Sequence, residues 1–490
     1  MIDLKNVDFI YNNAKTDIGV HEVDLEIPKG QVVLLCGSSG CGKTTLTRMI
    51  NGLIPNFYEG KLSGDITVCG LDVTKSELYE LTPFVGAVFQ NPKSQFYTVQ
   101  TDSEIVFGCE NIGMEKELIY QRFEEVVDRL NISPLLGRSL FALSGGQKQK
   151  IACASVAALF PEIMVMDEPS SNLDIETIYE LAEIIRQWKK EGKTVVIAEH
   201  RLYWLMDIAD RVIYIKEGKI LQDITIDQFK KLSTDTLEEM GLRSRRIAFD
   251  HIQIPTLESQ DYIQFKDFSF SYEKEKNVNI ESLTIPCGSV VAIIGKNGAG
   301  KSTFGRCMCG LEKRAKGTMA FCGKELKWKE RIKNCYLVMQ DVNHQLFTES
   351  VLDEILLSME SSNDNESLKK ANAEKILKAL NLDEFQEVHP MSLSGGQKQR
   401  VSVACALASD KKILVYDEPT SGLDYTRMLD VAEAIKNMQK RGKTQFVITH
   451  DPELIEKCCD YLMFMENGLV VEAGTIEGER LRRMKEFFMV

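Results

Sequence analysis

The chain reads Gly37-Ser38-Ser39-Gly40-Cys41-Gly42-Lys43-Thr44 and, further on, Gly295-Lys296-Asn297-Gly298-Ala299-Gly300-Lys301-Ser302. Both stretches fit G-x-x-x-x-G-K-[ST]. The glycines of this pattern let successive backbone N–H groups point at one anion, and its lysine reaches the outer phosphates of a nucleotide. Each stretch follows a short apolar run, residues 32–36 or 290–294, and opens a helical pattern, as a phosphate loop requires. We therefore predict two phosphate loops, and we add the residues that follow them to the nucleotide-binding set, Thr45 and Thr303.

Further motifs occur twice in the same order, at a constant distance along the chain. The difference is 250 residues for each pair: Gln90 and Gln340 (340 − 90), Ser144 and Ser394 (394 − 144), Asp167 and Asp417 (417 − 167), Asp174 and Asp424 (424 − 174), His200 and His450 (450 − 200). One motif could arise by chance. An ordered set held in register indicates a duplicated nucleotide-binding domain.

The spacing is longer near the start of the chain. Gly37 and Gly295 are 258 residues apart (295 − 37), so the first half carries eight extra residues (258 − 250) between its phosphate loop and Gln90. The extra residues fall around positions 54–60. We expect a longer loop there, and the alternative is that the insertion marks the first half for a distinct neighbour.

The composition describes a globular protein that does not cross a membrane by itself. At 490 residues, two or more domains are expected. The chain has no apolar run of about eighteen residues, and its start lacks the basic head and apolar body of a secretion signal. The net charge of −13 disfavours general nucleic-acid binding, and the 13 scattered cysteines indicate reduced thiols in the cytosol.

Short apolar runs alternate with helical stretches in both halves, which predicts an α/β core. Residues 2–9 and 23–27 alternate between apolar and polar side chains, as half-exposed antiparallel strands do. The continuous apolar runs at residues 32–36 and 163–166 predict buried parallel strands, and residues 101–160 are mostly helical in pattern.

Periodicity weakens in the middle of the chain, where the two halves join. We predict a first domain of residues 1–235, a linker of residues 236–260 and a second domain of residues 261–490. The join contains the basic run Arg243-Ser244-Arg245-Arg246. This run is expected to be a solvated face of the linker, and a docking site for a partner is the alternative.

Carboxylates and histidines follow apolar strands at matched positions. The pairs Asp167-Glu168 and Asp417-Glu418 end such strands. An aspartate there can hold Mg²⁺, and the next glutamate can orient or deprotonate an attacking water. His200 and His450 also follow apolar strands, where a histidine can contact a γ-phosphate and sense its loss.

Two further stretches, Ser144-Gly145-Gly146-Gln147 and Ser394-Gly395-Gly396-Gln397, are absent from simple phosphate-loop enzymes. With them, the chain resembles the ABC (ATP-binding cassette) ATPases over nearly all of both halves. The resemblance implies two tandem cassettes, each a mixed α/β core with an antiparallel β subdomain and a helical subdomain. It also implies ATP and Mg²⁺ as cofactors and ATP hydrolysis as the reaction. In the family, the Ser-Gly-Gly turn caps the γ-phosphate bound by the opposite cassette.

The resemblance assigns roles to other paired residues. Gln90 and Gln340 would touch Mg²⁺ and the attacking water, and Asp174 and Asp424 would couple the two sites. The predicted catalytic residues are Glu168, Glu418, His200, His450, Gln90 and Gln340. The predicted metal-binding residues are Thr44, Ser302, Gln90, Gln340, Asp167 and Asp417.

Tyr11 and Tyr272 occupy the positions at which the family stacks an aromatic ring on adenine. The resemblance therefore adds both tyrosines to the nucleotide-binding set. An aromatic side chain on a strand surface, with no nucleotide role, is the alternative for each.

Two classes of tandem ABC protein compete: transport motors, and soluble ATPases that act on ribosomes or DNA. The soluble forms usually carry a long charged arm, an iron–sulfur segment or zinc-binding insertions, and the sequence shows none of these. The acidic charge also disfavours nucleic acid. We therefore predict a transport ATPase without a nucleic-acid partner, and keep the soluble class as the less favoured alternative.

Among transporters, the chain resembles the fused ATPases of the energy-coupling factor (ECF) type, on residues 51–60, 89–92, 104–111, 198–201 and 340–347. This resemblance implies a transmembrane coupling subunit and a small substrate-binding membrane subunit as partners. It implies peripheral attachment to the cytoplasmic face of the cell membrane, and import of a vitamin, a vitamin precursor or a metal ion. The ATPase of a peptide-type importer is the alternative.

Overall fold

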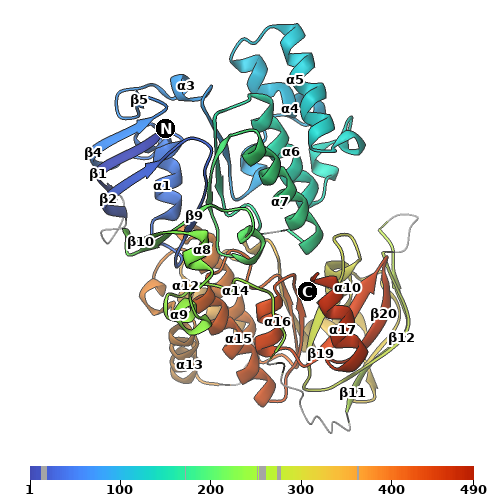
Figure 1. The fold of residues 1–490 in the computed structure, drawn as a ribbon. Helices are drawn as coiled ribbons and strands as arrows, with labels where there is room; N and C mark the ends of the chain where they lie inside the picture. The colour runs from blue at the N-terminus through green and yellow to red at the C-terminus, as the bar shows by residue number, and fades with distance from the viewer. Residues whose placement is uncertain are drawn as a thin grey trace. The chain divides into compact units, whose positions relative to one another are not determined.

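The computed structural model describes residues 1–12, 19–171, 173–250, 252, 261–272, 277–360 and 364–489. The chain folds into two compact units, Met1–Arg246 and Ile247–Val490, each of which is described by itself (Figure 1). Residues 251 and 253–260 of the predicted linker lie outside the described residues, so the predicted domain boundaries stay a prediction.

The first unit contains β1 (Ile2–Tyr11), β2 (Gly19–Ile27), β3 (Val32–Cys36), β4 (Gly60–Val68), β5 (Leu71–Asp72), β6 (Val85–Val88), β7 (Ile163–Asp167), β8 (Thr194–Ala198), β9 (Arg211–Lys216) and β10 (Lys219–Thr225). Its helices are α1 (Lys43–Ile50), α2 (Leu53–Asn56), α3 (Leu78–Leu81), α4 (Thr101–Asn111), α5 (Lys116–Arg129), α6 (Gly145–Ala158), α7 (Ile175–Lys190), α8 (Ile226–Phe229) and α9 (Thr234–Glu239).

The second unit contains β11 (Tyr262–Phe270), β12 (Val278–Pro286), β13 (Val290–Ile294), β14 (Lys316–Phe321), β15 (Lys324–Glu325), β16 (Cys335–Val338), β17 (Ile413–Asp417), β18 (Thr444–Ile448), β19 (Tyr461–Glu466) and β20 (Leu469–Thr475). Its helices are α10 (Lys301–Met308), α11 (Trp328–Asn334), α12 (Val351–Ser358), α13 (Glu366–Ala379), α14 (Gly395–Ala408), α15 (Tyr425–Lys440), α16 (Pro452–Cys458) and α17 (Gly478–Phe487).

Each unit is built on two sheets with the same topology. In the first unit an antiparallel sheet has the order β2-β1-β4-β5, and a six-stranded sheet has the order β10-β9-β3-β8-β7-β6. The second unit repeats this plan as β12-β11-β14-β15 and β16-β17-β18-β13-β19-β20. In each six-stranded sheet the strands run parallel except one edge strand, which is β10 in the first unit and β20 in the second. The predicted fold class, tandem domains with a mixed α/β core and an antiparallel subdomain, is confirmed.

Strand β3 separates two hydrophobic cores, because successive side chains of a strand point to opposite faces. Val33 and Leu35 pack with α1 and the antiparallel sheet. Val32, Leu34 and Cys36 pack with the helices of the other face, which include α4, α6 and α7. Figure 1 shows these helices grouped on the side away from β1, β2 and β4. The continuous apolar run that predicted a buried strand is therefore explained by burial on both faces.

The basic run at residues 243–246 differs from the expected solvated face. The side chain of Arg243 is buried. The guanidinium of Arg245 donates to the carbonyl oxygens of Phe229, at 3.4 Å, and Lys230. Carbonyl groups at the end of helix α8 attract a cation, so Arg245 anchors this segment to the first unit. Of the predicted solvated face, only Arg246 is exposed.

None of the helices in the described part of the chain is long and apolar enough to cross a bilayer.

Candidate active site

The predicted site residues of the first unit lie at the ends of four neighbouring strands. Parallel strands β3, β8, β7 and β6 are adjacent in the sheet. Their carboxyl ends lead to the phosphate loop, His200, Asp167-Glu168 and Gln90, respectively. Parallel strands place their carboxyl ends at one edge of a sheet, so residues far apart in the sequence meet there.

The first phosphate loop is a turn of residues 37–42 between β3 and α1, and Lys43, Thr44 and Thr45 open that helix. Gly37 has φ +151°, and a Cβ at this position would lie 2.2 Å from the carbonyl oxygen of Ile215, so only glycine fits the turn. The ammonium of Lys43 donates to the carbonyl oxygens of Gly37 and Ser38, both at 3.0 Å. These bonds hold its charge on the inner side of the loop, where an anion would bind.

The second phosphate loop, residues 295–300 between β13 and α10, opens on a cavity of about 260 Å³. This cavity gathers most of the predicted residues of the second site. It is lined by Asn277, Asn297, Gly298, Ala299, Gly300, Lys301, Ser302, Thr303, Gln340, Asp417, Glu418, Ile448 and His450. Asn277 was not predicted, because it belongs to no motif and is brought here by the antiparallel sheet. Its backbone amide donates to the carbonyl oxygen of Phe270 at 3.0 Å.

The predicted metal residues Thr44 and Asp167 meet, because the Thr44 hydroxyl donates to the Asp167 carboxylate at 3.1 Å. Within the described residues no group of three or more His, Cys, Asp or Glu side chains is arranged to hold a metal ion. Mg²⁺ suits such a sparse site, because it keeps several waters and takes its remaining ligands from one or two side chains and from substrate phosphates. One hydroxyl and one carboxylate beside a phosphate loop therefore fit Mg²⁺.

Burial raises the pKa of Asp167 to about 6, and the charge of Glu168 adds to this, while the hydrogen bond from Thr44 opposes it. Burial likewise raises the pKa of Asp417, against a hydrogen bond from Ser302. The ionised form of each aspartate is therefore poorly stabilised by the protein alone. A divalent cation bound at the same place would reverse that imbalance.

Glu168 lies at the centre of the predicted catalytic group of the first unit. The side-chain amide of Gln90 donates to its Oε2 at 2.7 Å, and Nε2 of His200 lies 3.3 Å from its Oε1. The backbone of Glu168 has φ +44°, in the left-handed region that non-glycine residues rarely adopt. Glu418 shares this conformation, with φ +52°, so both units hold this residue in a strained turn.

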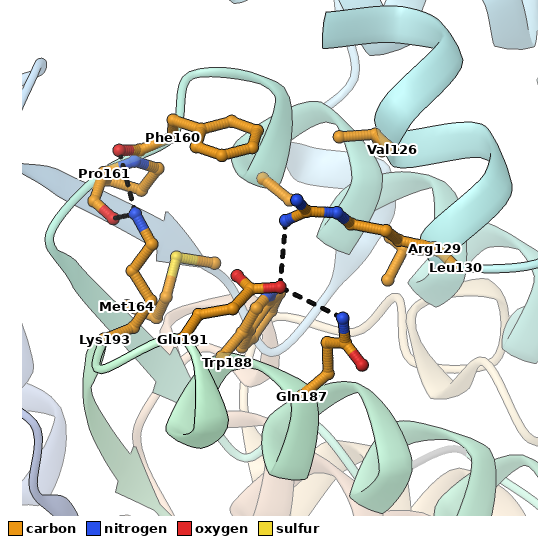
Figure 2. A pocket seen from close by; sticks show the side chains of 11 residues that line it. Val126, Arg129, Leu130, Phe160, Pro161, Met164, Gln187, Trp188, Glu191 and Lys193 are labelled. Carbon is orange, nitrogen blue, oxygen red and sulfur yellow. Dashed lines mark hydrogen bonds and ion pairs between the residues drawn. The ribbon is translucent and has the colours of Figure 1, made fainter.

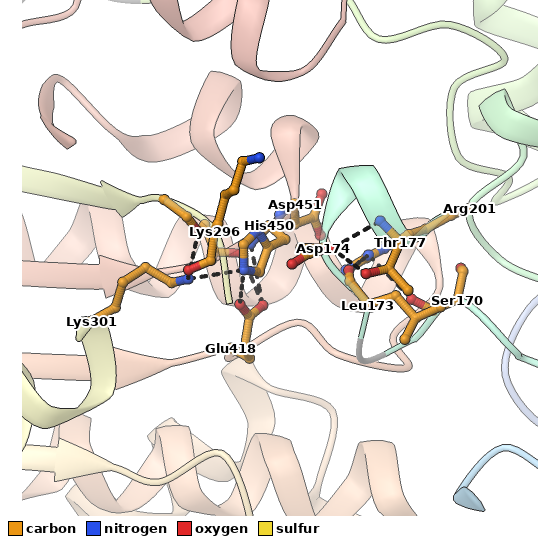
Figure 3. A network of polar contacts seen from close by, with 12 residues as sticks. Ser170, Leu173, Asp174, Thr177, Arg201, Lys296, Lys301, Glu418, His450 and Asp451 are labelled. Atoms are coloured by element: carbon orange, nitrogen blue, oxygen red, sulfur yellow. Dashed lines mark hydrogen bonds and ion pairs between the residues drawn. The ribbon is translucent and has the colours of Figure 1, made fainter. Parts of the chain in front are cut away.

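In the predicted catalytic group of the second unit, the histidine and the glutamate are joined by the phosphate-loop lysine (Figure 3). The ammonium of Lys301 lies 3.2 Å from Nε2 of His450 and donates to the carbonyl oxygen of Gly295 at 2.6 Å. Nε2 of His450 is 3.8 Å from Oε1 of Glu418, and the backbone amide of His450 donates to Oε2 of Glu418 at 3.3 Å. The structure thus brings the phosphate-loop lysine, the histidine and the glutamate together.

The two Ser-Gly-Gly turns begin helices α6 and α14. The predicted contact of each turn with a γ-phosphate requires such a helix start. The Ser144 hydroxyl accepts from the amide of Gln147 at 3.3 Å, and the Gln147 side chain accepts from the amide of Ser144 at 3.1 Å. Ser394 and Gln397 repeat these bonds at 3.4 and 2.8 Å. This reciprocal capping fixes each helix start and orients its remaining N–H groups.

The predicted adenine residue Tyr11 is contacted by Arg48 and Tyr58, neither of which was predicted as a site residue. Arg48 donates to the Tyr11 hydroxyl at 3.0 Å and lies 3.9 Å from the ring centroid of Tyr58. Tyr58 belongs to the eight-residue insertion, and its ring is edge-on to that of Tyr11. Tyr272 is more exposed, and its hydroxyl donates to Glu312 at 3.0 Å.

A separate hollow in the first unit lies at the end of α5 and α7 (Figure 2). Its rim holds an ion pair in which Arg129 donates to Glu191 at 2.9 Å. Its described lining residues are Val126, Arg129, Leu130, Ala157, Phe160, Pro161, Met164, Gln187, Trp188, Glu191 and Lys193. They include none of the predicted site residues, so this hollow is not the nucleotide site.

Each unit contains a phosphate loop and, later in the chain, a helix that begins at a Ser-Gly-Gly turn. Two such sets define a pair of ATP-binding cassettes. A family model described as ABC transporter matches residues 20–171 and 278–421. The chain belongs to the ABC transporter family, as an ATP-binding protein with two cassettes. It is therefore an ATPase that uses ATP with Mg²⁺, and the predictions of the enzyme class and of the cofactors are confirmed.

Relatives of similar length carry the same description. A putative ABC transporter ATP-binding protein of Treponema denticola is 44% identical over 482 residues, which cover 96% of each chain. A second protein of that organism with the same description is 38% identical over 98% of each chain. A relative from Caldanaerobacter subterraneus is 30% identical over 98% of this chain and 93% of its own.

Solved structures share the fold over both units. The structure titled as a model of ribosome-bound archaeal Pelota and ABCE1 has a TM-score of 0.72 and 24% identity, over 98% of this chain and 80% of that one. The structure titled RNase-L Inhibitor has a TM-score of 0.66 and 23% identity, over 98% and 92%. At this identity the likeness shows the fold alone.

These findings correct the predicted partners. We expected a transmembrane coupling subunit, a small substrate-binding membrane subunit, peripheral membrane association and no nucleic acid. The same two-cassette fold occurs in a protein whose title places it on the ribosome. The prediction of these partners is therefore wrong. It rested on the resemblance of short segments to the ECF type and, for nucleic acid, on the acidic net charge.

Proposed function

We propose that both units hydrolyse ATP and that the two sites drive one cycle in which the cassettes close and separate. The observation that carries this proposal is the contact of Glu168 with Gln90 and His200, beside a phosphate loop that holds Lys43. It places an acceptor for a water proton, a water-orienting amide and a phosphate-sensing imidazole at one strand edge. The second unit supports it with Glu418, His450 and Lys301.

In this proposal the lysines bind the β- and γ-phosphates, and the hydroxyls of Thr44 and Ser302 join Asp167 and Asp417 around Mg²⁺. Mg²⁺ would neutralise charge on the phosphates. Glu168 and Glu418 accept a proton from the attacking water. His200 and His450 hold the γ-phosphate and lose that contact after hydrolysis.

The family resemblance adds the step that links the sites. Each γ-phosphate would also be held by the Ser-Gly-Gly turn of the other cassette, at Ser394 or Ser144. Moving such a closure equilibrium from 1:99 to 99:1 takes about 5.5 kcal/mol of differential binding. Charge-assisted hydrogen bonds contribute about 1.5–3 kcal/mol each, so a few of them per ATP supply this energy.

The work of this cycle has two candidate targets. The first is a macromolecular assembly outside the membrane, such as the ribosome, on which a two-cassette ATPase would close and open. It is supported by the likeness of the fold over 98% of the chain to structures titled as ribosome-bound and ribosome-recycling proteins. We place it first, because a two-unit ATPase can act on such an assembly without a further subunit.

The second candidate is ATP-driven import of a small micronutrient, by the ECF or the peptide-importer route. The names of the relatives favour it, since proteins 44% and 38% identical over nearly the whole chain are described as putative ABC transporter ATP-binding proteins. This candidate shares the two ATP sites with the first and differs in what the cassettes move.

One experiment separates the two candidates. A Glu168→Gln, Glu418→Gln double variant should hold ATP without splitting it and stay closed on its target. We expect it to sediment with ribosomal particles of its source cells in ATP but not in ADP. Sedimentation as free protein in both nucleotides, together with loss of vitamin or metal-ion uptake when the gene is deleted, would instead establish the import candidate.

A further inference from the structure

The two histidine turns differ in the residues on either side of the histidine. The first unit has Glu199-His200-Arg201 after β8, and the second has Thr449-His450-Asp451 after β18. All of these flanking side chains are buried, including Glu199 and Arg201, which are only 2% and 6% exposed. Burying a carboxylate and a guanidinium is unfavourable unless each is hydrogen-bonded, so their contacts indicate what they do.

In the first unit, Glu199 binds two separate turns. Its Oε1 accepts from the backbone amides of His200, at 2.7 Å, and Arg201, at 3.1 Å. Its Oε2 accepts from the amide of Ser170 at 3.3 Å. One buried carboxylate therefore joins the histidine turn to the turn that follows Glu168.

Arg201 binds the same second turn from its carbonyl side (Figure 3). Its guanidinium donates to the carbonyl oxygens of Ser170 and Leu173, both at 3.5 Å. Leu173 precedes Asp174, whose side chain accepts from the amide of Thr177 at 2.9 Å and begins helix α7. Glu199 and Arg201 together tie His200 to the start of α7.

In the second unit, the catalytic glutamate makes the equivalent bond. The backbone amide of His450 donates to Oε2 of Glu418 at 3.3 Å, and the hydroxyl of Thr449 lies 3.5 Å from the same atom. Asp451 accepts from the hydroxyl of Thr420 at 2.7 Å. The histidine amide is thus held by Glu199 in one unit and by Glu418 in the other.

We propose that Glu199 and Arg201 are positioning residues of the first ATP site, and that they make this site the faster of the two. Glu199 holds the histidine turn, while the carboxylate of Glu168 meets the side-chain amide of Gln90 at 2.7 Å. In the second site, the carboxylate of Glu418 holds the amide of His450 and is also the proposed base, and the bond from that amide lowers its affinity for a proton from water. This inference rests on the proposed role of Glu168 and Glu418 as bases.

The first test compares the two sites in the full-length chain. Steady-state phosphate release is measured for Glu418→Gln, in which only the first site keeps its base, and for Glu168→Gln, in which only the second does. We expect Glu418→Gln to retain several times more hydrolysis. Equal rates, a higher rate for Glu168→Gln, or complete loss in Glu418→Gln would each overturn the inference.

The second test concerns Glu199 itself. In the Glu418→Gln background, Glu199→Thr introduces the residue found at this position of the second unit. This change should lower kcat about tenfold, because it removes about one hydrogen bond to a charged group, and KM for ATP should not change. Glu199→Gln keeps an oxygen that accepts from His200 and should recover most of the rate. A purely structural role would move KM and thermal stability together and would not give this rescue.

The matched control places Glu199→Thr in the Glu168→Gln background, where the remaining hydrolysis occurs at the second site and should not change. A similar fall in both backgrounds would mean general destabilisation and would overturn the inference. If Glu199→Thr does not fold, Arg201→Lys takes its place, because one ammonium cannot reach both carbonyl oxygens as the guanidinium does. If neither single Glu→Gln variant lowers hydrolysis, the proposed function itself fails, which distinguishes the two failures.

Discussion

The side-chain amide of Gln90 donates to Oε2 of Glu168 at 2.7 Å, although the two residues are 78 positions apart in the chain. The reason lies in the sheet. Strands β6 and β7 pair in parallel, with Val88 opposite Met166, so the residues that follow both strands leave the same edge. Glu168 then turns through a positive φ of +44°, which brings its carboxylate toward Gln90.

Removal of the Glu168 charge should stop chemistry at the first site without stopping nucleotide binding. General base catalysis contributes about 10²–10⁴-fold, so Glu168→Gln should lower phosphate release at this site by about a hundredfold or more. The measurement is single-turnover hydrolysis in the Glu418→Gln background, with ATP affinity measured separately. The exposed residue Glu117 provides a control, because Glu117→Gln changes the same charge on helix α5. Hydrolysis that survives Glu168→Gln at full rate would remove Glu168 from the proposed role.

Much of this site could be predicted from the sequence, because its signals are local. A run such as Val32–Cys36 is apolar at every position and is buried on both faces of β3. A serine followed three residues later by glutamine, as in Ser144 and Gln147, forms the capping bonds that such spacing favours. Periodicity and spacing are enough to place elements of this kind.

Other parts of the site depend on contacts between distant segments, for which the sequence holds no local signal. Glu199 follows a strand like many charged residues, and only the approach of Ser170 explains its burial. Tyr58 lies in an insertion that was expected to be a loop, and it reaches the ring of Tyr11. Arg243 is buried although its basic neighbours suggested a solvated run. Charge predicts exposure only where tertiary structure offers no partner.

The stability of the nucleotide-free protein should depend on the protonation of Asp167. Folding raises the pKa of this carboxyl from 3.8 to about 6, so the folded chain holds the proton more tightly than the unfolded chain. The resulting stabilisation is complete below about pH 4 and is lost as the pH rises through about 6. Asp167→Asn cannot ionise. The melting temperature of this variant, relative to that of the unaltered protein, should therefore rise between pH 4.5 and 7. The size of the rise is set by the size of the pKa shift.

The same variant tests the metal site. Because Mg²⁺ needs the ionised carboxylate, binding of Mg²⁺ and ATP should release protons in the unaltered protein near pH 6 and release fewer in Asp167→Asn. Calorimetry in buffers of different ionisation enthalpy measures this release. A melting difference that stays flat with pH, or equal proton release in both proteins, would contradict the assigned pKa shift.

Gly146 should be intolerant of any side chain, although it lies in a helix. A Cβ at this position would come within 2.8 Å of both Cγ2 and Oγ1 of Thr177, and Thr177 is fixed by its bond to Asp174 at the start of α7. Gly146→Ala should therefore destabilise the first unit by about 1–3 kcal/mol, as overpacked sites do. Gly395 is the control, because a Cβ there meets nothing within 4 Å. Thermal unfolding of the two alanine variants should differ in that direction, and an equal effect would show that α6 can move away from α7.

The insertion of the first half should strengthen ATP binding at one site only. Arg48 lies over the ring of Tyr58, at 3.9 Å, and donates to the hydroxyl of Tyr11, so loss of the Tyr58 ring releases the side chain that holds Tyr11. Aromatic contacts of this kind contribute about 0.5–1.5 kcal/mol, so Tyr58→Ala should weaken ATP binding at the first site roughly threefold.

A double-mutant cycle with Tyr11→Ala tests whether Tyr58 acts on ATP binding through Tyr11. If it does, Tyr58→Ala should add nothing in the Tyr11→Ala background. Tyr79→Ala removes an exposed ring from α3 and should leave the affinity unchanged. Additive losses for Tyr58 and Tyr11 would mean that the insertion acts on the nucleotide by another path.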